Sequence, residues 1–384
     1  MSKAFNLSGC NNEGEMALKK IMVVCGGRST EHEISLRSAC NVLNSLDREK
    51  YRVYGLFIDK EGRMIPLGEV VRPVERPEDL IRSAEGTVLD SVGRFASWAA
   101  ELQADAEEPL LIFPLIHGQT GEDGELQGFF QALGLPYVGT RLTASALCMD
   151  KGFANQIFRE AGLPKAKFYV LNRFSYDACI SAQQRTRLLD EIVETCGPRL
   201  FVKPANNGSS IGVSRADREN LEEALALAFQ YDRRVVIEEE IVGRELEVSI
   251  LGNGTARASL PGSYTSHRDL LDYTAKYNDK KTEENVPHPL SEEKYDEVRE
   301  LALRAYHALC CEGYARVDIF MDEKEQFYVN EINTSPGMTP TSLASKLWTS
   351  LTEMTFSEYL DAIIAYGEAS EETIQDIATS WEDQ

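Results

Sequence analysis

The chain has 384 residues, of which 40 are basic and 62 are acidic, so its formal net charge is −22. This excess of negative charge argues against nucleic acid or a membrane surface as a partner, because both attract clustered positive charge. The length suits two or three domains, and no apolar run is long enough for a membrane-spanning helix. Eight cysteines without a C-x-x-C spacing, and a start without a signal-peptide pattern, predict reduced thiols in a cytoplasmic protein.

The first domain is predicted over residues 19–139, after a polar extension at residues 1–18. It begins with a buried-strand pattern at residues 20–25, followed by Gly26 and Gly27 and by an amphipathic helix. Two later apolar runs, YRVYGLFI and LLIFPLI, alternate with helical stretches. This alternation predicts a parallel α/β sheet.

The loop before the first helix reads GGRSTEHE and lacks the G-x-G-x-x-G spacing of a dinucleotide site. Glu33 lies near the start of the helix, where it could receive an ammonium group from a substrate. The alternative is a structural role, in which Ser29 or Thr30 caps the helix and the acidic residues favour its dipole.

A second unit is predicted over residues 140–239, where a strand ends at Lys203 and a Gly/Ser loop follows. Backbone N–H groups of the loop around Ser209 and Ser210 could close over phosphates. No Walker sequence occurs in the chain, and a plain turn is the alternative for this loop.

The third unit is predicted over residues 240–368, with a lid loop at residues 262–290 and an acidic, flexible tail at residues 369–384. An acidic cluster near the start of this unit consists of Glu238, Glu239, Glu240 and Glu245. The cluster is either a solvated strand edge or a site that recognises adenine and ribose.

Residues 314–333 read as a hairpin with its turn at Lys324 and Glu325. This register places Asp318 opposite Glu331 and Arg316 opposite Asn333, so the four side chains share one face. Carboxylate and amide oxygens suit Mg²⁺, which often shares its ligands with nucleotide phosphates. Ordinary charge pairs on a solvated hairpin are the alternative.

In order and spacing, these motifs resemble the ATP-grasp superfamily, and the D-alanine:D-alanine ligases in particular. The segments that carry the resemblance span residues 20–366 and include GGRSTEHEISLRSA, LIHGQTGEDGELQG, FVKPANNGSSIGVS, IEEEIVGRELEVSILG, DYTAKY, ARVDIF and NEINTSPGMTPTSL. The resemblance implies an α/β and α+β fold, in which a parallel α/β pre-ATP-grasp domain precedes a two-lobed ATP-grasp module. It also implies that ATP phosphorylates one D-alanine, whose acyl phosphate is then attacked by the amine of a second D-alanine.

Residue roles follow from the same resemblance. For ATP, they involve Lys151, Lys203, Ser210, Glu238, Glu239, Ile241, Glu245 and, on the transferred phosphate, Lys276. Asp318, Glu331 and Asn333 would hold Mg²⁺, expected as two ions that Mn²⁺ could replace. Glu33, Ser209 and Tyr277 would form a hydrogen-bonded trio around the first ammonium group, and Arg316 and His117 would assist the reacting groups. Gly337, Ser342 and Leu343 would line the second amino-acid subsite.

Leu270, Leu271 and Ser263 depart from the family pattern around the lid, which leaves the packing of the lid over the nucleotide open. D-Serine or D-lactate as second substrate, another ATP-grasp carboxylate–amine ligase, and a nucleotide-binding regulator without turnover are the alternatives. The resemblance also implies a homodimer.

Overall fold

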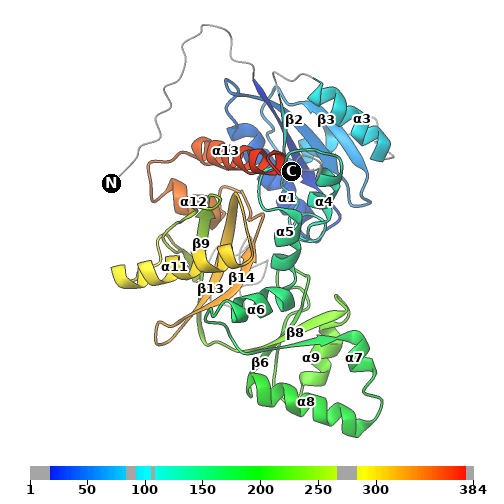
Figure 1. The fold of residues 1–384 in the computed structure, drawn as a ribbon, viewed down its shortest axis with the longest axis vertical. Coiled ribbons are helices and arrows are strands. Elements are labelled where there is room, and N and C mark those ends of the chain that lie inside the picture. Colours follow the sequence, from blue (N-terminus) through cyan, green and yellow to red (C-terminus); the bar gives the residue numbers. More distant parts are fainter. Residues whose placement is uncertain (1–17, 84–91, 105–108, 266–282, 378–384) are drawn as a thin grey trace, which may run out of the picture.

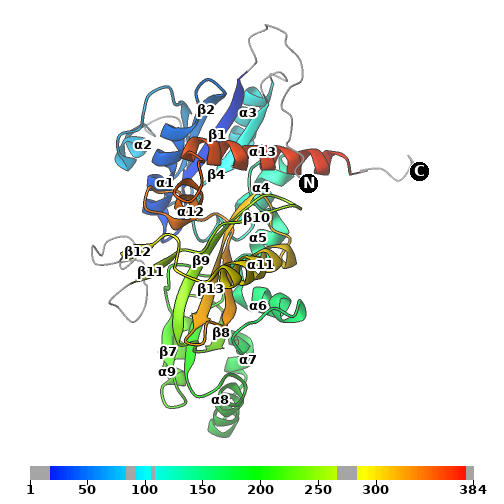
Figure 2. The same cartoon turned by 90° about the vertical axis from the view of Figure 1, so that its left-hand side faces the viewer.

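The computed structural model describes residues 18–83, 92–104, 109–265 and 283–377. Within this part of the chain, three four-stranded sheets lie one after another along the long axis of the molecule, each with helices packed on it (Figures 1 and 2). In the described residues, each helix is too short or too polar to cross a lipid bilayer.

The N-terminal sheet has the strand order β3-β2-β1-β4. Its strands are β1 (Lys19–Gly26), β2 (Tyr51–Ile58), β3 (Met64–Glu69) and β4 (Leu110–Pro114), and its helices are α1 (His32–Ser45), α2 (Pro77–Ser83), α3 (Val92–Gln103) and α4 (Glu125–Ala132). Helix α5 (Leu142–Met149) follows and contacts α4, α6 (Lys151–Glu160) and β14 (Phe327–Asn333). The predicted parallel pairing is confirmed for β1 with β2 and with β4. The edge strand β3 differs, since it pairs antiparallel with β2. The connection between these two strands is too short for a parallel crossover.

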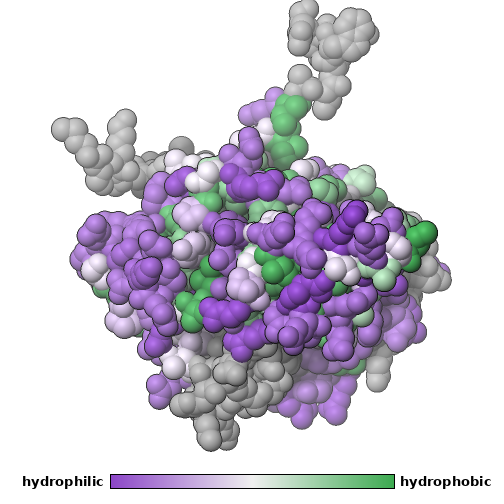
Figure 3. Space-filling model, turned by 90° about the horizontal axis from the view of Figure 1, so that it is seen from below, coloured by the Kyte–Doolittle hydropathy of each residue, from purple (hydrophilic) through white to green (hydrophobic). Residues whose placement is uncertain are grey.

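The sheet that comes second in the sequence, called the middle sheet, lies at the lower end of the molecule in Figure 1. It has the order β5-β8-β6-β7, and all its pairs are antiparallel. It consists of β5 (Phe168–Asn172), β6 (Leu200–Pro204), β7 (Ser214–Ala216) and β8 (Arg234–Glu239), with α6 (Lys151–Glu160), α7 (Arg173–Asp177), α8 (Ala182–Cys196) and α9 (Leu221–Ala228). Helices α8 and α9 pack on this sheet. Leu189, Ile192 and Leu225 of the helices share a core with Val202 and Ile237 of the sheet. Seen from this end, the surface is largely hydrophilic with separate small hydrophobic areas, as the charge of the chain leads one to expect (Figure 3).

The C-terminal sheet has the order β10-β9-β13-β14, and β11 and β12 form a small sheet beside it. These strands are β9 (Gly243–Leu251), β10 (Arg257–Ala258), β11 (Ser263–Thr265), β12 (Glu283–Asn285), β13 (Tyr314–Asp322) and β14 (Phe327–Asn333). The remaining helices are α11 (Glu292–Ala308), α12 (Leu343–Thr349) and α13 (Phe356–Gln375). Helix α11 packs on this sheet through Val298, Leu301, Ala302 and Ala305.

The expectation of a flexible tail from residue 369 is wrong for its first part. Helix α13 continues to Gln375 and packs on the N-terminal domain as well as on α12 of the preceding unit (Figure 1). Ile363 and Ile364 are buried in the same core as Ile21 and Leu36. The last helix therefore returns the chain to the first domain.

Candidate active site

A cavity of about 610 Å³ lies where the three sheets meet. Most of the predicted site residues line it. They are His117, Lys151, Lys203, Ser209, Ser210, Glu238, Glu239, Ile241, Glu245, Arg316, Asp318, Glu331, Asn333 and Gly337. The structure thus gathers residues as far apart in the sequence as His117 and Gly337 into one polar cavity.

The hairpin of β13 and β14 forms one wall of this cavity. The two predicted pairs are confirmed, because Arg316 pairs with Asn333 and Asp318 pairs with Glu331. The predicted register is wrong nearer the turn, since a bulge between Asp318 and Ile319 shifts it by one residue. Each pair is two residues from the next along its strand, so the four side chains point to the same face.

Asp318 is the most deeply buried acid on this wall, with 1% of its surface exposed. The Arg316 guanidinium donates two hydrogen bonds of 2.7 Å to its carboxylate, and Asn333 Nδ2 donates a third at 2.9 Å. Burial raises the pKa of Asp318 to about 7; Arg316 opposes the rise, and Glu247 and Glu245 add to it. The wall therefore holds more negative charge than Arg316 alone balances.

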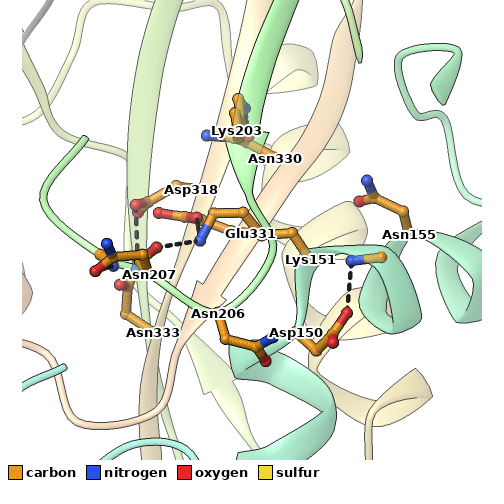
Figure 4. A network of polar contacts seen from close by, with 12 residues as sticks. Asp150, Lys151, Asn155, Lys203, Asn206, Asn207, Asp318, Asn330, Glu331 and Asn333 are labelled. Carbon is orange, nitrogen blue, oxygen red and sulfur yellow. Dashed lines mark hydrogen bonds and ion pairs between the residues drawn. The ribbon is translucent and has the colours of Figure 1, made fainter. Parts of the chain in front are cut away.

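Lys151 joins the hairpin to the Gly/Ser loop that follows β6, as Figure 4 shows. Its Nζ lies 3.0 Å from Glu331 Oε2 and donates to the backbone oxygen of Asn207 at 2.9 Å. Burial acts to raise the pKa of Glu331, but attraction by Lys151 and Lys203 outweighs it and lowers that pKa to about 2. Glu331 is therefore an anion at neutral pH.

The donor chemistry of this wall fits a divalent cation. Asp318 and Glu331 supply carboxylate oxygens, and Asn333 supplies an amide oxygen, all hard ligands of the kind that Mg²⁺ prefers. Among the described residues, no cluster of three or more His, Cys, Asp or Glu side chains forms a complete metal site. The set accordingly suits an ion that takes its other ligands from water and phosphate.

Glu238, which also lines the cavity, binds two buried lysines. Its carboxylate accepts from Lys165 at 2.7 Å and from Asn155 at 2.8 Å through Oε1, and from Lys203 at 2.6 Å through Oε2. Burial acts to raise the pKa of Glu238, but Lys165 and Lys203 together hold it well below its usual range. Its side chain thus fixes the position of Lys203, the lysine predicted to contact phosphate.

Glu31, rather than Glu33, reaches the cavity. Ser209 Oγ donates to Glu31 Oε1 at 2.6 Å, the contact that the sequence analysis assigned to Glu33. Gly118 and Gly208 permit this approach, since a Cβ at Gly118 would lie 2.5 Å from Glu31 Oε2. Glu33 instead lies in the first turn of α1, half exposed, with its carboxylate 2.7 Å from Lys60.

His117 and Glu122 connect the N-terminal domain to the loop after β14. The ring of His117 lies between Ser38 Oγ at 2.9 Å and the backbone oxygen of Ser335 at 2.8 Å. Glu122 accepts from the backbone N–H groups of Gly118 at 2.7 Å and Ser335 at 3.1 Å. Burial lowers the pKa of His117, and burial together with Glu31 raises the pKa of Glu122 to about 8.

Besides Glu33, two predicted residues in the described part of the chain do not line the cavity. Ser342 is buried and caps the turn at Thr339, and Leu343 begins α12 with its side chain in the core. Lys276 and Tyr277, and also Leu270 and Leu271, lie outside the described residues.

The sequence analysis missed Glu31, Lys165, Asn155, Glu122 and Ser38. Glu31, Ser38 and Glu122 stood inside motifs that it had quoted, and the acidic type of Glu31 and Glu122 was the available signal. Lys165, Asn155 and Ser38 act through partners far away in sequence, and those partners cannot be read from local patterns.

Comparison with known proteins agrees with this geometry. A model of the D-ala D-ala ligase N-terminus matches residues 20–140, and a model of the D-ala D-ala ligase C-terminus matches residues 157–365. A D-alanine–D-alanine ligase of Finegoldia magna is 42% identical over 348 residues, covering 90% of this chain and 95% of that protein. Its counterpart in Geobacillus thermodenitrificans is 38% identical, covering 90% and 94%.

Solved structures give the same result. The D-alanine-D-alanine ligase of Coxiella burnetii matches with a TM-score of 0.73 and 31% identity, covering 93% of this chain and 96% of that one. The VanG D-Ala:D-Ser ligase of Enterococcus faecalis matches with a TM-score of 0.75 and 29% identity, covering 91% and 99%. The fold and the site thus define an ATP-grasp enzyme. Within that class, the chain belongs to the D-alanine–D-alanine ligase family.

Proposed function

We propose that this enzyme uses ATP to join two D-alanine molecules into D-alanyl-D-alanine through a D-alanyl phosphate, as a step in the synthesis of bacterial peptidoglycan precursors. The observation that carries the proposal is one cavity in which Lys151, Lys203 and Arg316 face Asp318 and Glu331. Phosphoryl transfer depends on positioning and on neutralising charge, and this arrangement supplies both.

ATP would bind between the middle and C-terminal sheets. Lys151 and Lys203 would neutralise its inner phosphates, while the segment from Glu239 to Ile241 would contact adenine and Glu245 the ribose. Asp318, Glu331 and Asn333 would hold Mg²⁺, which supplies charge neutralisation at the terminal phosphates. Arg316 would turn its guanidinium from Asp318 to the transferred phosphoryl group, because the cation replaces it as partner of that carboxylate.

The first D-alanine would bind near Glu31 and Ser209, whose hydrogen bond already joins the N-terminal domain to the Gly/Ser loop. Its ammonium group suits the Glu31 carboxylate. The second D-alanine would wait at the cavity wall formed by Pro336 and Gly337. Lys276 and Tyr277 retain their predicted roles in this proposal as groups of the lid.

D-Alanine is preferred as second substrate, because the relatives that are 34–42% identical are named D-alanine–D-alanine ligases. D-Serine is the second candidate, since VanG shares the fold over nearly its whole length. A difference of this kind can depend on a few contacts worth about 1–3 kcal/mol.

Phosphate release from ATP tests the proposal, measured with Mg²⁺ and D-alanine and then with D-serine or D-lactate added. We expect release only when D-alanine is present, with formation of D-alanyl-D-alanine seen by mass spectrometry and loss of both on chelation of Mg²⁺. Release that does not depend on D-alanine would contradict the ligase proposal. Nucleotide binding without any release would favour a regulator.

The proposal also includes a cytoplasmic location and a homodimer. The described cysteines are free thiols, as reducing compartments favour. The dimer rests on family resemblance alone, and sedimentation of the purified chain measures it.

A further inference from the structure

The backbone of residues 335–338 is held at four points by side chains of the N-terminal domain. Ser335 donates its N–H to Glu122 at 3.1 Å and accepts from His117 Nδ1 at 2.8 Å. Met338 donates its N–H to Ser38 Oγ at 3.1 Å and accepts from Asn41 Nδ2 at 2.7 Å. This segment includes Gly337, the residue proposed to face the second amino acid.

Helix α1 provides half of this clamp. Ser38 and Asn41 are three residues apart, so they project from one face of the helix. Ser38 contacts the backbone N–H of Met338, and Asn41 contacts its backbone oxygen. Ser38 is fully buried, and α1 is itself packed against the N-terminal sheet through Leu36, Ala39 and Leu43. A rigid helix thereby sets the position of a loop 300 residues later in the chain.

The hydrogen-bond directions assign the proton on His117. The backbone oxygen of Ser335 only accepts, so His117 Nδ1 carries the proton. The N–H of Met338 only donates, so Ser38 Oγ accepts there. Burial lowers the pKa of His117, which favours an unprotonated Nε2 that accepts the hydrogen of Ser38 Oγ. His117 is therefore a neutral imidazole whose two nitrogens are both engaged.

We propose that Ser38, acting through His117 and Met338, is a positioning residue that holds the wall of the second amino-acid subsite. The inference rests on the proposed function, because it takes residues 336–337 as that wall. When the four hydrogen bonds to Ser335 and Met338, here called the clamp, are intact, the wall is formed before the second amino acid arrives. Binding of that amino acid then costs less conformational entropy, because the loop is already ordered.

Ser38→Ala tests this role, with Ser35→Ala as its control. Ser35 lies one turn earlier on α1, is equally buried, and bridges Gly26 and Leu115 without touching residues 335–338. Rates are measured as a function of D-alanine and fitted with separate constants for the two amino acids. Ser38→Ala is expected to raise the constant for the second amino acid roughly tenfold, with little change for ATP or the first amino acid.

Nitrogen NMR of His117 gives a readout that does not need activity. Wild type should show a protonated Nδ1 and an unprotonated Nε2, and Ser38→Ala should shift the Nε2 signal. A protonated Nε2 in wild type, or equal kinetic effects of Ser38→Ala and Ser35→Ala, would overturn the inference. An inactive wild type with the expected nitrogen signals would instead count against the proposed function.

Asn41→Ala provides a second kinetic test if Ser38→Ala fails to fold. Asn41 is only partly buried and holds the other backbone group of Met338. The Asn41→Ala variant should raise the same kinetic constant for the second amino acid. An unchanged constant in this variant would overturn the clamp.

Discussion

Glu31 and Glu33 stand two positions apart in one motif, but only Glu31 reaches the cavity. Each helical position turns the side chain by about 100°, so residues two apart point to different sides. Glu31 precedes α1 and faces Ser209, whereas Glu33 faces Lys60 on the surface. The motif predicted an acidic residue at the cavity, but the direction in which the chain enters α1 decides that this residue is Glu31.

Glu31→Gln and Glu33→Gln form a matched pair that tests this selection. Removing the charge at Glu31 should lower kcat/KM for the first D-alanine roughly 10- to 100-fold, since an ammonium group loses its ionic partner. Glu33→Gln should leave kcat/KM within about twofold, because its partner Lys60 is at the surface. Equal losses in the two variants would mean that Glu31 has no special place.

Glu238 is the residue on which two buried lysines depend. Glu238→Gln would remove the carboxylate that Lys165 and Lys203 both contact, and removing one partner of a buried pair costs about 3–5 kcal/mol. We therefore expect the free energy of unfolding in urea to fall by about 3 kcal/mol or more. Glu33→Gln serves as the control, because an exposed pair contributes at most about 1 kcal/mol.

The effect of Glu238 should depend on pH in a defined direction. Its pKa is lowered in the folded protein from an ordinary value of 4.5, so the unfolded chain binds the proton more readily. The stability that Glu238 contributes is thus complete above pH 4.5 and is lost as the pH falls below it. The stability gap between wild type and Glu238→Gln should narrow on acidification, and a gap that widened would contradict this assignment.

At the scale of elements, α13 is where the sequence prediction failed. An acidic, polar composition was interpreted as flexibility, but Glu, Ala and Gln are also good helix formers. The helix continues because contacts distant in sequence hold it. Lys19 pairs with Glu368 at 2.6 Å, and Arg141 pairs with Glu371 at 3.1 Å.

Ile363→Ala tests the contribution of α13 to the N-terminal core. Ile363 has no exposed surface and packs in the cluster that contains Ile21 and Leu36, so its truncation leaves a cavity. We expect a loss of about 2–5 kcal/mol in the free energy of unfolding, measured with urea. Ile377→Ala, at a side chain that is 64% exposed, should change it by less than about 0.5 kcal/mol. Similar values for the two variants would mean that α13 does not stabilise the first domain.

The hairpin of β13 and β14 was predicted in part. Side chains that alternate with a period of two led to the pairs of Asp318 with Glu331 and of Arg316 with Asn333, which the structure has. After Asp318 a bulge shifts the register by one residue, so Ile319 pairs with Val329 and the turn includes Glu323 as well as Lys324 and Glu325. The edge strand β3 was not predicted. Its sequence, MIPLGE, is short and contains Pro and Gly, both of which weaken a strand pattern.

On the scale of the whole molecule, function depends on three sheets meeting at one cavity. The N-terminal domain contributes Glu31 and His117, the middle sheet Lys203, and the C-terminal sheet Arg316 and Asp318. The net charge of −22 is compatible with an anionic substrate, because Lys151, Lys203 and Arg316 supply positive charge inside this cavity. None of the three units holds the complete site.

The sequence by itself determined the family, the nature of the chemistry, and the pairing of Asp318 with Glu331 in the hairpin of β13 and β14. These follow from short spacings, in which neighbouring residues have fixed relative directions. Only the tertiary structure decided that Glu31 replaces Glu33, that Glu238 holds Lys165 and Lys203, and that Ser38 and Asn41 hold Met338. Such contacts join residues far apart in the chain, and their partners are set by how the three sheets pack together.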